Sequence, residues 1–235
     1  MDDELDEEEL GQRAWRPDPE VIARAIKTFH PSPQKKSAVV MDRKEKIAFI
    51  ANKFQEILEA LGMDLSDPSL ARTPQRIAKM YVEEIFAGLD EENFPRITLL
   101  PNLWEKEAVV HPIFIKSTFT SFCEHHFVPM YGTAYVAYCP RGKLIGLSKV
   151  PRLVHYFAKR PQLQERLTAQ IADALALLLD IEDVAVSITA QHFCVIARGI
   201  ENNSSHTTTT VLRGRFEKEL SLRSEFFEAI ARPFV

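Results

Sequence analysis

Apolar side chains recur every three or four positions over residues 42–62, DRKEKIAFIANKFQEILEALG, and this period predicts an amphipathic helix. Asp42 and Glu45 stand three residues apart just before the first apolar positions, as in a capping box. Gly62 follows the last apolar position, where helices commonly end. The pattern therefore predicts one long helix whose start and end are both encoded locally.

A second helix is predicted over residues 72–89, RTPQRIAKMYVEEIFAGL, with Thr73 as its cap and Gly88 at its end. Arg76 and Lys79 are three positions apart in its early turns, so their side chains share a face. Such a pair is typical of a solvated surface. A clamp for an anion is the alternative interpretation.

Residues 107–216 carry a different pattern, in which strand-like and helix-like stretches follow one another in the order β-β-α-α-β-β. The stretches are AVVHPIFIKSTFTSF and GTAYVAYC (strands), VPRLVHYFAKR and PQLQERLTAQIADALALLL (helices), and DVAVSITAQHFCV and HTTTTVLRGRF (strands). Two strand pairs separated by a helix pair predict an α+β fold with an antiparallel sheet and helices over one face. A last helix is predicted in RSEFFEAIAR.

These patterns divide the 235 residues into an extension, 1–41, and one domain, 42–235. The domain comprises a helical part, 42–90, the β-β-α-α-β-β core, 107–216, and a C-terminal helix within 217–235. The extension begins with seven acidic residues and no base among its first ten, and it contains four prolines, so we predict that it is partly disordered. Its one helical stretch, PEVIARAIKTF, leaves a docking or regulatory segment as the alternative.

Charge and composition exclude several classes of protein. The formal net charge is −4, but without the first ten residues 26 acids face 29 bases, a balance of +3 that suits an anionic ligand and is too mild to indicate nucleic acid. Neither a signal peptide nor a membrane-spanning stretch is indicated, because the longest apolar run is only ALALLL. Three cysteines are too few for a disulfide framework, so we expect a cytoplasmic protein in which Cys beside His points to metal binding or catalysis.

The stretch SFCEHHF places Cys123 and His126 at a spacing that suits zinc ligands. A second group, QHFC, contributes His192 and Cys194. If this group lies in a strand, side chains two positions apart point to the same face, and Cys194 can complete a three-ligand site that leaves a position open for water. A structural site with four ligands would recruit His125 or His192 instead. Spacing alone leaves the two possibilities equally open.

Five motifs, CEHHFVPMYG, IGLSKVPRLV, KRPQLQERLTAQIA, QHFCVIARGI and TTTT, occur in this order. Together they resemble the GTP cyclohydrolase I family of zinc enzymes, over about residues 42–232. The resemblance implies a tunnelling fold, in which β-β-α-α-β-β units assemble into a barrel within a toroidal homodecamer. It also implies active sites between subunits, one Zn²⁺ per subunit, and conversion of GTP to 7,8-dihydroneopterin triphosphate with release of formate, the first step of folate and pterin synthesis.

The resemblance also assigns roles to single residues. Cys123, His126 and Cys194 match the zinc ligands, and zinc can lower the pKa of a bound water to about 7, which yields a nucleophile for C8 of guanine. His125 matches a catalytic histidine that handles a proton at the purine ring, and His192 one that acts nearer the ribose.

The remaining matched residues would bind the substrate. Glu165 matches the carboxylate that accepts N–H bonds from guanine, and Gln164 beside it is expected to help fix the base. Ser148 matches a catalytic residue near the ribose and phosphates. The triphosphate clamp implied by the resemblance consists of Lys149, Arg152, Arg198, Arg76 and Lys79.

Two rival functions stay open at this point. One is a catalytically inactive, zinc-stabilised binding module on the same fold, although such proteins usually lose a ligand or the residue that anchors the base. The other is an enzyme of related fold that handles another purine or pterin. Neither requires nucleic acid or a membrane as partner.

Overall fold

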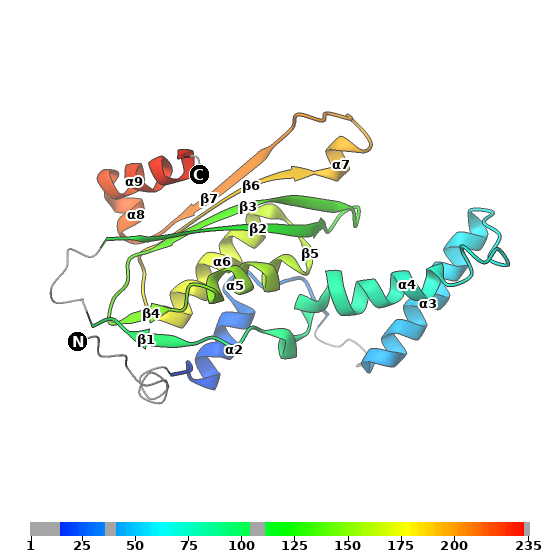
Figure 1. The fold of residues 1–235 in the computed structure, drawn as a ribbon, viewed down its shortest axis with the longest axis horizontal. Helices are drawn as coiled ribbons and strands as arrows, with labels where there is room; N and C mark the ends of the chain where they lie inside the picture. The colour runs from blue at the N-terminus through cyan, green and yellow to red at the C-terminus, as the bar shows by residue number, and fades with distance from the viewer. Residues whose placement is uncertain (1–14, 36–40, 104–110, 233–235) are drawn as a thin grey trace, which may run out of the picture.

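A computed structural model describes residues 15–35, 41–103 and 111–232 (Figure 1). Most of the described chain belongs to one α+β unit. Its helices are α2 (Pro19–Lys27), α3 (Arg43–Ala60), α4 (Thr73–Met80), η1 (Tyr81–Ile85), η2 (Ala87–Leu89), η3 (Glu91–Asn93), α5 (Lys149–Ala158), α6 (Gln164–Leu179), α7 (Phe193–Ile196), α8 (Arg215–Lys218) and α9 (Leu220–Ala231). Its strands are β1 (Leu99–Pro101), β2 (Ile113–Cys123), β3 (Pro129–Tyr138), β4 (Lys143–Ile145), β5 (Pro161–Gln162), β6 (Val184–His192) and β7 (Thr207–Leu212).

The main sheet has five strands in the order β5-β2-β3-β6-β7. The pairs β2–β3, β3–β6 and β6–β7 are antiparallel, and only the short β5 runs parallel to its neighbour β2. The predicted β-β-α-α-β-β order is therefore confirmed, with α5 and α6 between the two strand pairs. The short strands β1 and β4, which pair with each other in a separate sheet, had no counterpart in the prediction.

Helices lie on both faces of the sheet, whereas the sequence predicted them on one. Helices α5 and α6 cover one face, where Val136 and Tyr138 of β3 join the main core. Ala137, which lies between those residues on β3, points to the opposite face and packs in a smaller core with Phe216 and Phe226. The strict alternation of a strand thus supplies both cores, and β3 is buried on both sides near its end.

The predicted helix over residues 42–62 is confirmed as α3, with both hydrogen bonds of the capping box formed by Asp42 and Glu45. Gly62 ends it with φ +75°, a conformation that other residues rarely adopt. Several of its apolar side chains remain exposed in the single chain; Phe49, for example, is 51% accessible. In Figure 1, α3 and α4 form an arm that extends away from the sheet.

The second predicted helix is not continuous. Helix α4 gives way at Tyr81 to one turn of π-helix, and the segment ends in the 3-10 turn that contains Gly88. Thr73 is the first helical residue and makes no capping bond, so the predicted cap is wrong. Gly88 is required by packing, because a Cβ there would lie 2.0 Å from the carbonyl oxygen of Tyr156.

The part of the extension within residues 15–35 packs against the domain. Helix α2 contacts α6, and Trp15 bridges to Leu99 of β1. The backbone N–H of Phe29 and the ring of His30 both bond the buried carboxylate of Asp173 on α6, at 3.0 and 2.8 Å. Partial disorder was predicted for the whole extension, and its residues 1–14 and 36–40 lie outside the described part of the chain. None of the described helices is both long and apolar enough to cross a membrane.

Candidate metal centre and active site

Three predicted ligands come together at one end of the sheet. Cys123 is the last residue of β2, His126 lies in the turn toward β3, and Cys194 belongs to α7. Their ligand atoms lie within 4.8 Å of one another, and Cys123 Sγ is 3.9 Å from His126 Nδ1. Among the described residues, these three are the group of Cys, His and acidic side chains that converges in this way.

The local structure that places Cys194 at this centre differs from the predicted one. The prediction extended a strand through residues 183–195, but β6 ends at His192 and the chain turns into the single-turn helix α7. Strand alternation therefore does not place Cys194. The helical turn does, by directing its side chain back toward the end of β2.

The turn after β2 is closed by local bonds and by aromatic packing. Phe127 adopts φ +53° and its N–H donates to the carbonyl of Cys123 at 2.9 Å. Its ring lies 5.2 Å from that of Phe86 and 6.3 Å from that of Tyr81, centroid to centroid. The π-helical turn that interrupts the arm therefore packs directly on the residue after His126, a location typical of such turns near functional sites.

The donor set fits zinc. Two thiolates and one imidazole are the ligands that zinc prefers, and bonds of about 2.3 Å to sulfur and 2.1 Å to nitrogen in a tetrahedral site separate such atoms by about 3.6 Å. The 3.9 Å between Cys123 and His126 is close to that value. Neither His125 nor His192 belongs to the converging group, which favours three protein ligands over four.

The ring of His192 is hydrogen-bonded to Gln164, the first residue of α6. The Nε2 of His192 lies 2.7 Å from the Gln164 amide oxygen. The Gln164 amide nitrogen donates to the carbonyls of Ile188 and Thr207 at 3.0 and 2.9 Å, so the amide orientation is fixed by two strands. Burial lowers the pKa of His192 below its ordinary value, while the carboxylate of Glu165 opposes that shift.

His125 lies beside the metal ligands, and Glu165 lies close enough to His192 for its charge to act on the pKa of that imidazole. His125 Nδ1 lies 3.9 Å from Cys123 Sγ, and its side chain is exposed. Glu165 follows Gln164 in the first turn of α6 and is exposed in the single chain. Arg198, just after α7, also belongs here, because its Nη1 lies 2.8 Å from His126 Nε2.

One ion pair at this centre involves a residue that the sequence did not single out. Arg166 binds both carboxylate oxygens of Glu124, the residue between the ligands Cys123 and His126, at 2.5 and 3.2 Å. The available signal was the position of Arg166 next to Glu165 in a first helical turn, but sequence spacing says nothing about a partner 42 residues away.

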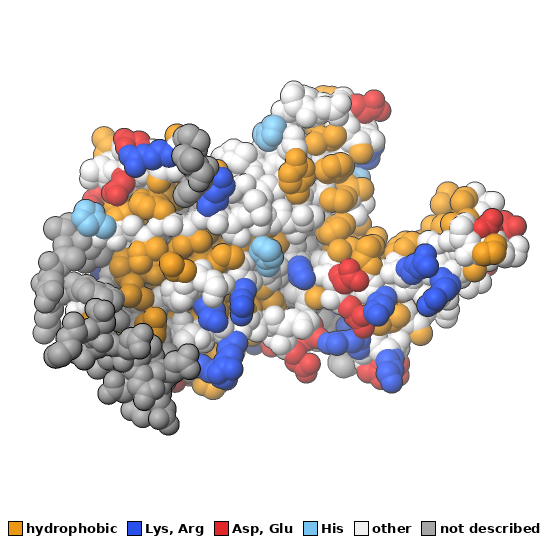
Figure 2. Space-filling view, viewed as in Figure 1, with side chains coloured by type: hydrophobic (Ala, Val, Ile, Leu, Met, Phe, Trp, Pro, Cys, Tyr) orange, Lys and Arg blue, Asp and Glu red, His pale blue; other side chains and the backbone are white. Residues whose placement is uncertain are grey.

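The other predicted site residues lie elsewhere in the same chain. Ser148 precedes α5, Lys149 and Arg152 are on α5, and Arg76 and Lys79 are on α4. Among the described residues, no hydrogen bond or ion pair joins these five to the metal ligands. Basic side chains gather over α5 and along the arm, where acidic ones are interspersed (Figure 2).

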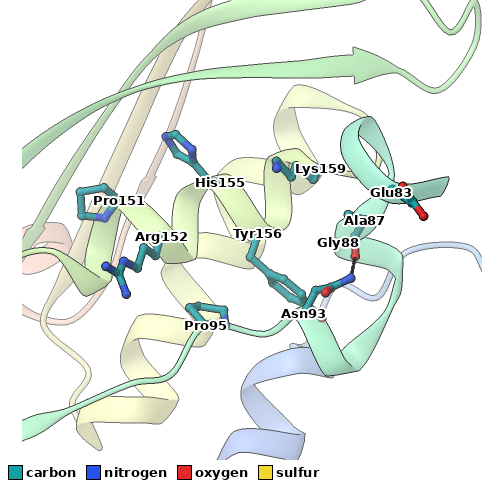
Figure 3. Close-up of a pocket in the computed structure, with 10 residues that line it drawn as sticks. All are labelled: Glu83, Ala87, Gly88, Asn93, Pro95, Pro151, Arg152, His155, Tyr156 and Lys159. Carbon is teal, nitrogen blue, oxygen red and sulfur yellow. Dashed lines mark hydrogen bonds between the residues drawn. The ribbon is translucent and has the colours of Figure 1, made fainter. Parts of the chain in front are cut away.

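A cavity of about 440 Å³ opens beside α5. One side is lined by Arg152 and His155 of α5 and by Lys159 just after it, and the other by Glu83 and Asn93 (Figure 3). The ring of His155 bonds the carbonyl of β2 residue 118 at 3.0 Å, so it is held to the sheet. Arg152 thus faces a cavity of its own, apart from the metal ligands.

The family model and the similar sequences agree on one family. The model of the family described as GTP cyclohydrolase I matches residues 50–231. Proteins named GTP cyclohydrolase 1 are similar over most of the chain: that of Photobacterium profundum is 53% identical over 81% of this chain and 87% of its own, that of Vibrio cholerae 53% over 82% and 87%, and that of Salmonella arizonae 50% over 89% and 92%. A solved structure, archaeosine synthase QueF-Like in the apo form, aligns with 45% of this chain and 94% of its own at 14% identity, and its TM-score of 0.38 is too low to decide the fold.

Proposed function

Because the chain belongs to the GTP cyclohydrolase I family, we propose that it converts GTP to 7,8-dihydroneopterin triphosphate with release of formate. The observation that carries the proposal is the convergence of Cys123, His126 and Cys194, with His125 beside Cys123 and His192 two residues before Cys194. The relatives cover most of this chain and are covered by it, so the assignment concerns the whole domain.

We propose one zinc ion per subunit, held by Cys123, His126 and Cys194. Zinc at this position supplies Lewis-acid chemistry that makes water a nucleophile near neutral pH. The soft thiolates favour zinc over magnesium or calcium, which take oxygen ligands. Thiolate ligands also fit the reducing cytoplasm, where we place the protein.

His125 and His192 would transfer protons. An imidazole can give and accept protons near neutral pH, and the exposed His125 sits beside the ligands, where the purine ring would lie. The contact with Gln164 Oε1 implies that His192 carries its proton on Nε2, since the amide oxygen only accepts. Its Nδ1 is then the atom that accepts a proton. Ser148 would act near the ribose and phosphates.

Glu165 would bind the guanine by accepting hydrogen bonds from its N1 and 2-amino groups. Adenine lacks those donors, and an unpaired polar group in a covered site costs the wrong base heavily. Gln164 would serve the base indirectly, because its amide already bonds His192 and two strand carbonyls.

The triphosphate would be bound by residues from more than one copy of the chain. Arg198 lies at the metal centre, 2.8 Å from Nε2 of His126; if His126 bound the metal through Nδ1, its Nε2 would keep a proton and the guanidinium would lack an acceptor there. An incoming phosphate oxygen would satisfy it. Lys149, Arg152, Arg76 and Lys79 lie on α5 and α4 instead.

We therefore propose that α5 and α4 of neighbouring subunits complete each site, in a toroidal homodecamer whose sheets close a barrel. The apolar positions of α3 that are exposed in the single chain support an assembled state, in which another subunit would cover them. Nucleic acid and membranes are not proposed as partners.

Incubating the zinc-loaded protein with GTP tests the proposal. We expect one formate per GTP and, after mild oxidation, a fluorescent pterin. An inactive zinc-stabilised module would yield neither product. An enzyme for another purine or pterin would leave GTP intact, so GTP consumption, formate and pterin together separate the three functions.

A further inference from the structure

The ion pair between Glu124 and Arg166 connects the metal-binding turn to the helix that would bind guanine. Both side chains are largely shielded, at 17% exposure for Arg166 and 19% for Glu124. The guanidinium makes two bonds to the carboxylate, a geometry that fixes direction as well as distance. Glu124 is also anchored through its backbone, whose N–H donates to the carbonyl of Gln162 at 3.0 Å.

The first turn of α6 holds the metal centre at two points. Gln164 bonds His192, and Arg166 bonds Glu124 in the turn between the ligands. Glu165, the residue between them, is the carboxylate proposed to bind guanine. The consecutive residues 164–166 would therefore fix the position of the guanine relative to both the metal-binding turn and His192.

The pairing argues against other roles for these two side chains. Both oxygens of Glu124 are used by Arg166, and Glu124 is not among the converging ligand atoms, so it is not a fourth metal ligand. The guanidinium of Arg166 already binds the carboxylate of Glu124, so it is not available to bind a phosphate.

We infer that Glu124 and Arg166 are positioning residues, which fix the metal-binding turn relative to Glu165 and so would set where the guanine bound by Glu165 lies relative to the metal ligands. This inference rests on the proposed function. A reacting atom displaced by about 1 Å can lose about 10²-fold in rate even when binding is intact. Loss of the pair should therefore lower kcat more than it raises KM.

The experiment is a double-mutant cycle on the zinc-loaded enzyme with Glu124→Gln, Arg166→Gln and both changes together. Each single change should lower kcat by about 10- to 100-fold and change KM for GTP less than about threefold, with zinc still stoichiometric. The kcat of the double variant should not fall below that of the more impaired single variant, because both substitutions remove the same contact. Arg166→Lys keeps the charge without the paired geometry and should lose an intermediate amount, which preserves the test if Arg166→Gln fails to fold.

A second two-bond ion pair, more exposed than the first, provides the control. Arg215 and Glu219 also form a two-bond ion pair, at 2.8 and 3.0 Å, but they lie at α8, among residues with no proposed role in the site. The corresponding Gln variants should shift the melting temperature without changing kcat. Zinc affinity, measured by competition with a chelator, separates positioning from loss of metal.

Two results would overturn the inference. One is a kcat within twofold of the unchanged enzyme in every variant of Glu124 and Arg166. The other is a loss of activity fully accounted for by lost zinc, so that turnover per bound zinc is unchanged. If the unchanged chain releases no formate from GTP, the proposed function itself fails, and that outcome is distinct from either.

Discussion

The amide oxygen of Gln164 lies 2.7 Å from Nε2 of His192, and the same amide group spans the carbonyls of Ile188 and Thr207 on two strands. A polar side chain that is buried and fully bonded is rigid, and it passes that rigidity to the imidazole. His192 is therefore fixed by the sheet and α6 together, before any substrate arrives.

Replacing Gln164 tests this support. Gln164→Ala should lower kcat by about tenfold or more, because His192 loses the acceptor that fixes its ring and its protonated nitrogen. It should also destabilise the fold by about 1–3 kcal/mol, because the buried carbonyl of Ile188 loses a donor. Zinc content, formate release and urea unfolding are the measurements. Gln191→Ala, next to His192 on β6, is the control; normal turnover in Gln164→Ala would contradict the assignment.

Substitutions of the adjacent residues His125 and His126 should have different effects on zinc content and on formate release. His126→Ala removes a metal ligand and should yield protein depleted in zinc and inactive. His125→Ala should retain zinc and slow formate release by about 10²- to 10⁴-fold, as expected for loss of a proton-transfer group. Metal content by atomic emission, measured beside formate, decides. Zinc loss in both variants would restore the four-ligand site, and a reversed outcome would exchange the two roles.

Mixed oligomers test whether the site is shared between chains. His125→Ala and Arg152→Ala should each be nearly inactive alone, since one lies at the metal centre and the other on α5. If neighbouring subunits complete each site, particles containing both variants regain activity, up to about a quarter of the sites by random association. The chains are co-expressed with different tags, purified through both tags and assayed for formate. Absence of any recovery in mixed particles would place the site within one chain.

The sequence predicted those features that are encoded within a few residues. The capping box of Asp42 and Glu45 and the turn at Gly62 are local, and so is the period of the strands and helices. The π-helical turn at Tyr81 was not predictable, because the aromatic rings that pack on it come from distant segments. Tertiary packing overrode local propensity there.

Some features of the candidate site could likewise be predicted from the sequence, and others could not. Residue types and spacing, with the family resemblance, brought Cys123, His126 and Cys194 forward, and the structure brings them together. The strand extended through Cys194 was wrong, because the helical turn of α7 forms where the strand pairing ends. The partner of Arg166 depends on how α6 meets the turn after β2, and no local pattern carries that information.

The N-terminal segment should contribute to stability through Asp173. This buried carboxylate bonds Arg213 of the core as well as Phe29 and His30 of the segment. Asp173→Ala should cost about 3 kcal/mol, because it leaves Arg213 partly buried without its partner. His30→Ala, whose ring is about half exposed, should cost less than about 1 kcal/mol. Urea unfolding checks both values, and equal effects would show that the bond to the segment dominates.

The last prediction concerns Cys139, a buried thiol that lies apart from the metal centre, in the smaller core against α9. Burial raises the pKa of this thiol to about 11, and the nearby carboxylate of Asp183 adds to the rise. In the unfolded chain the thiol titrates near its ordinary value, about 8.5.

Between those two values the folded state therefore holds a proton that the unfolded state has lost, so stability should fall as pH rises from about 9 to 11. The loss from this group should not exceed about 3.4 kcal/mol. Cys139→Ala removes the titration, and its unfolding free energy should decline less steeply over the same range, although it starts lower at pH 8 because of the lost packing. Urea midpoints of both proteins at pH 8, 9, 10 and 11 give the comparison. Parallel curves would show that the buried thiol does not contribute to alkaline unfolding.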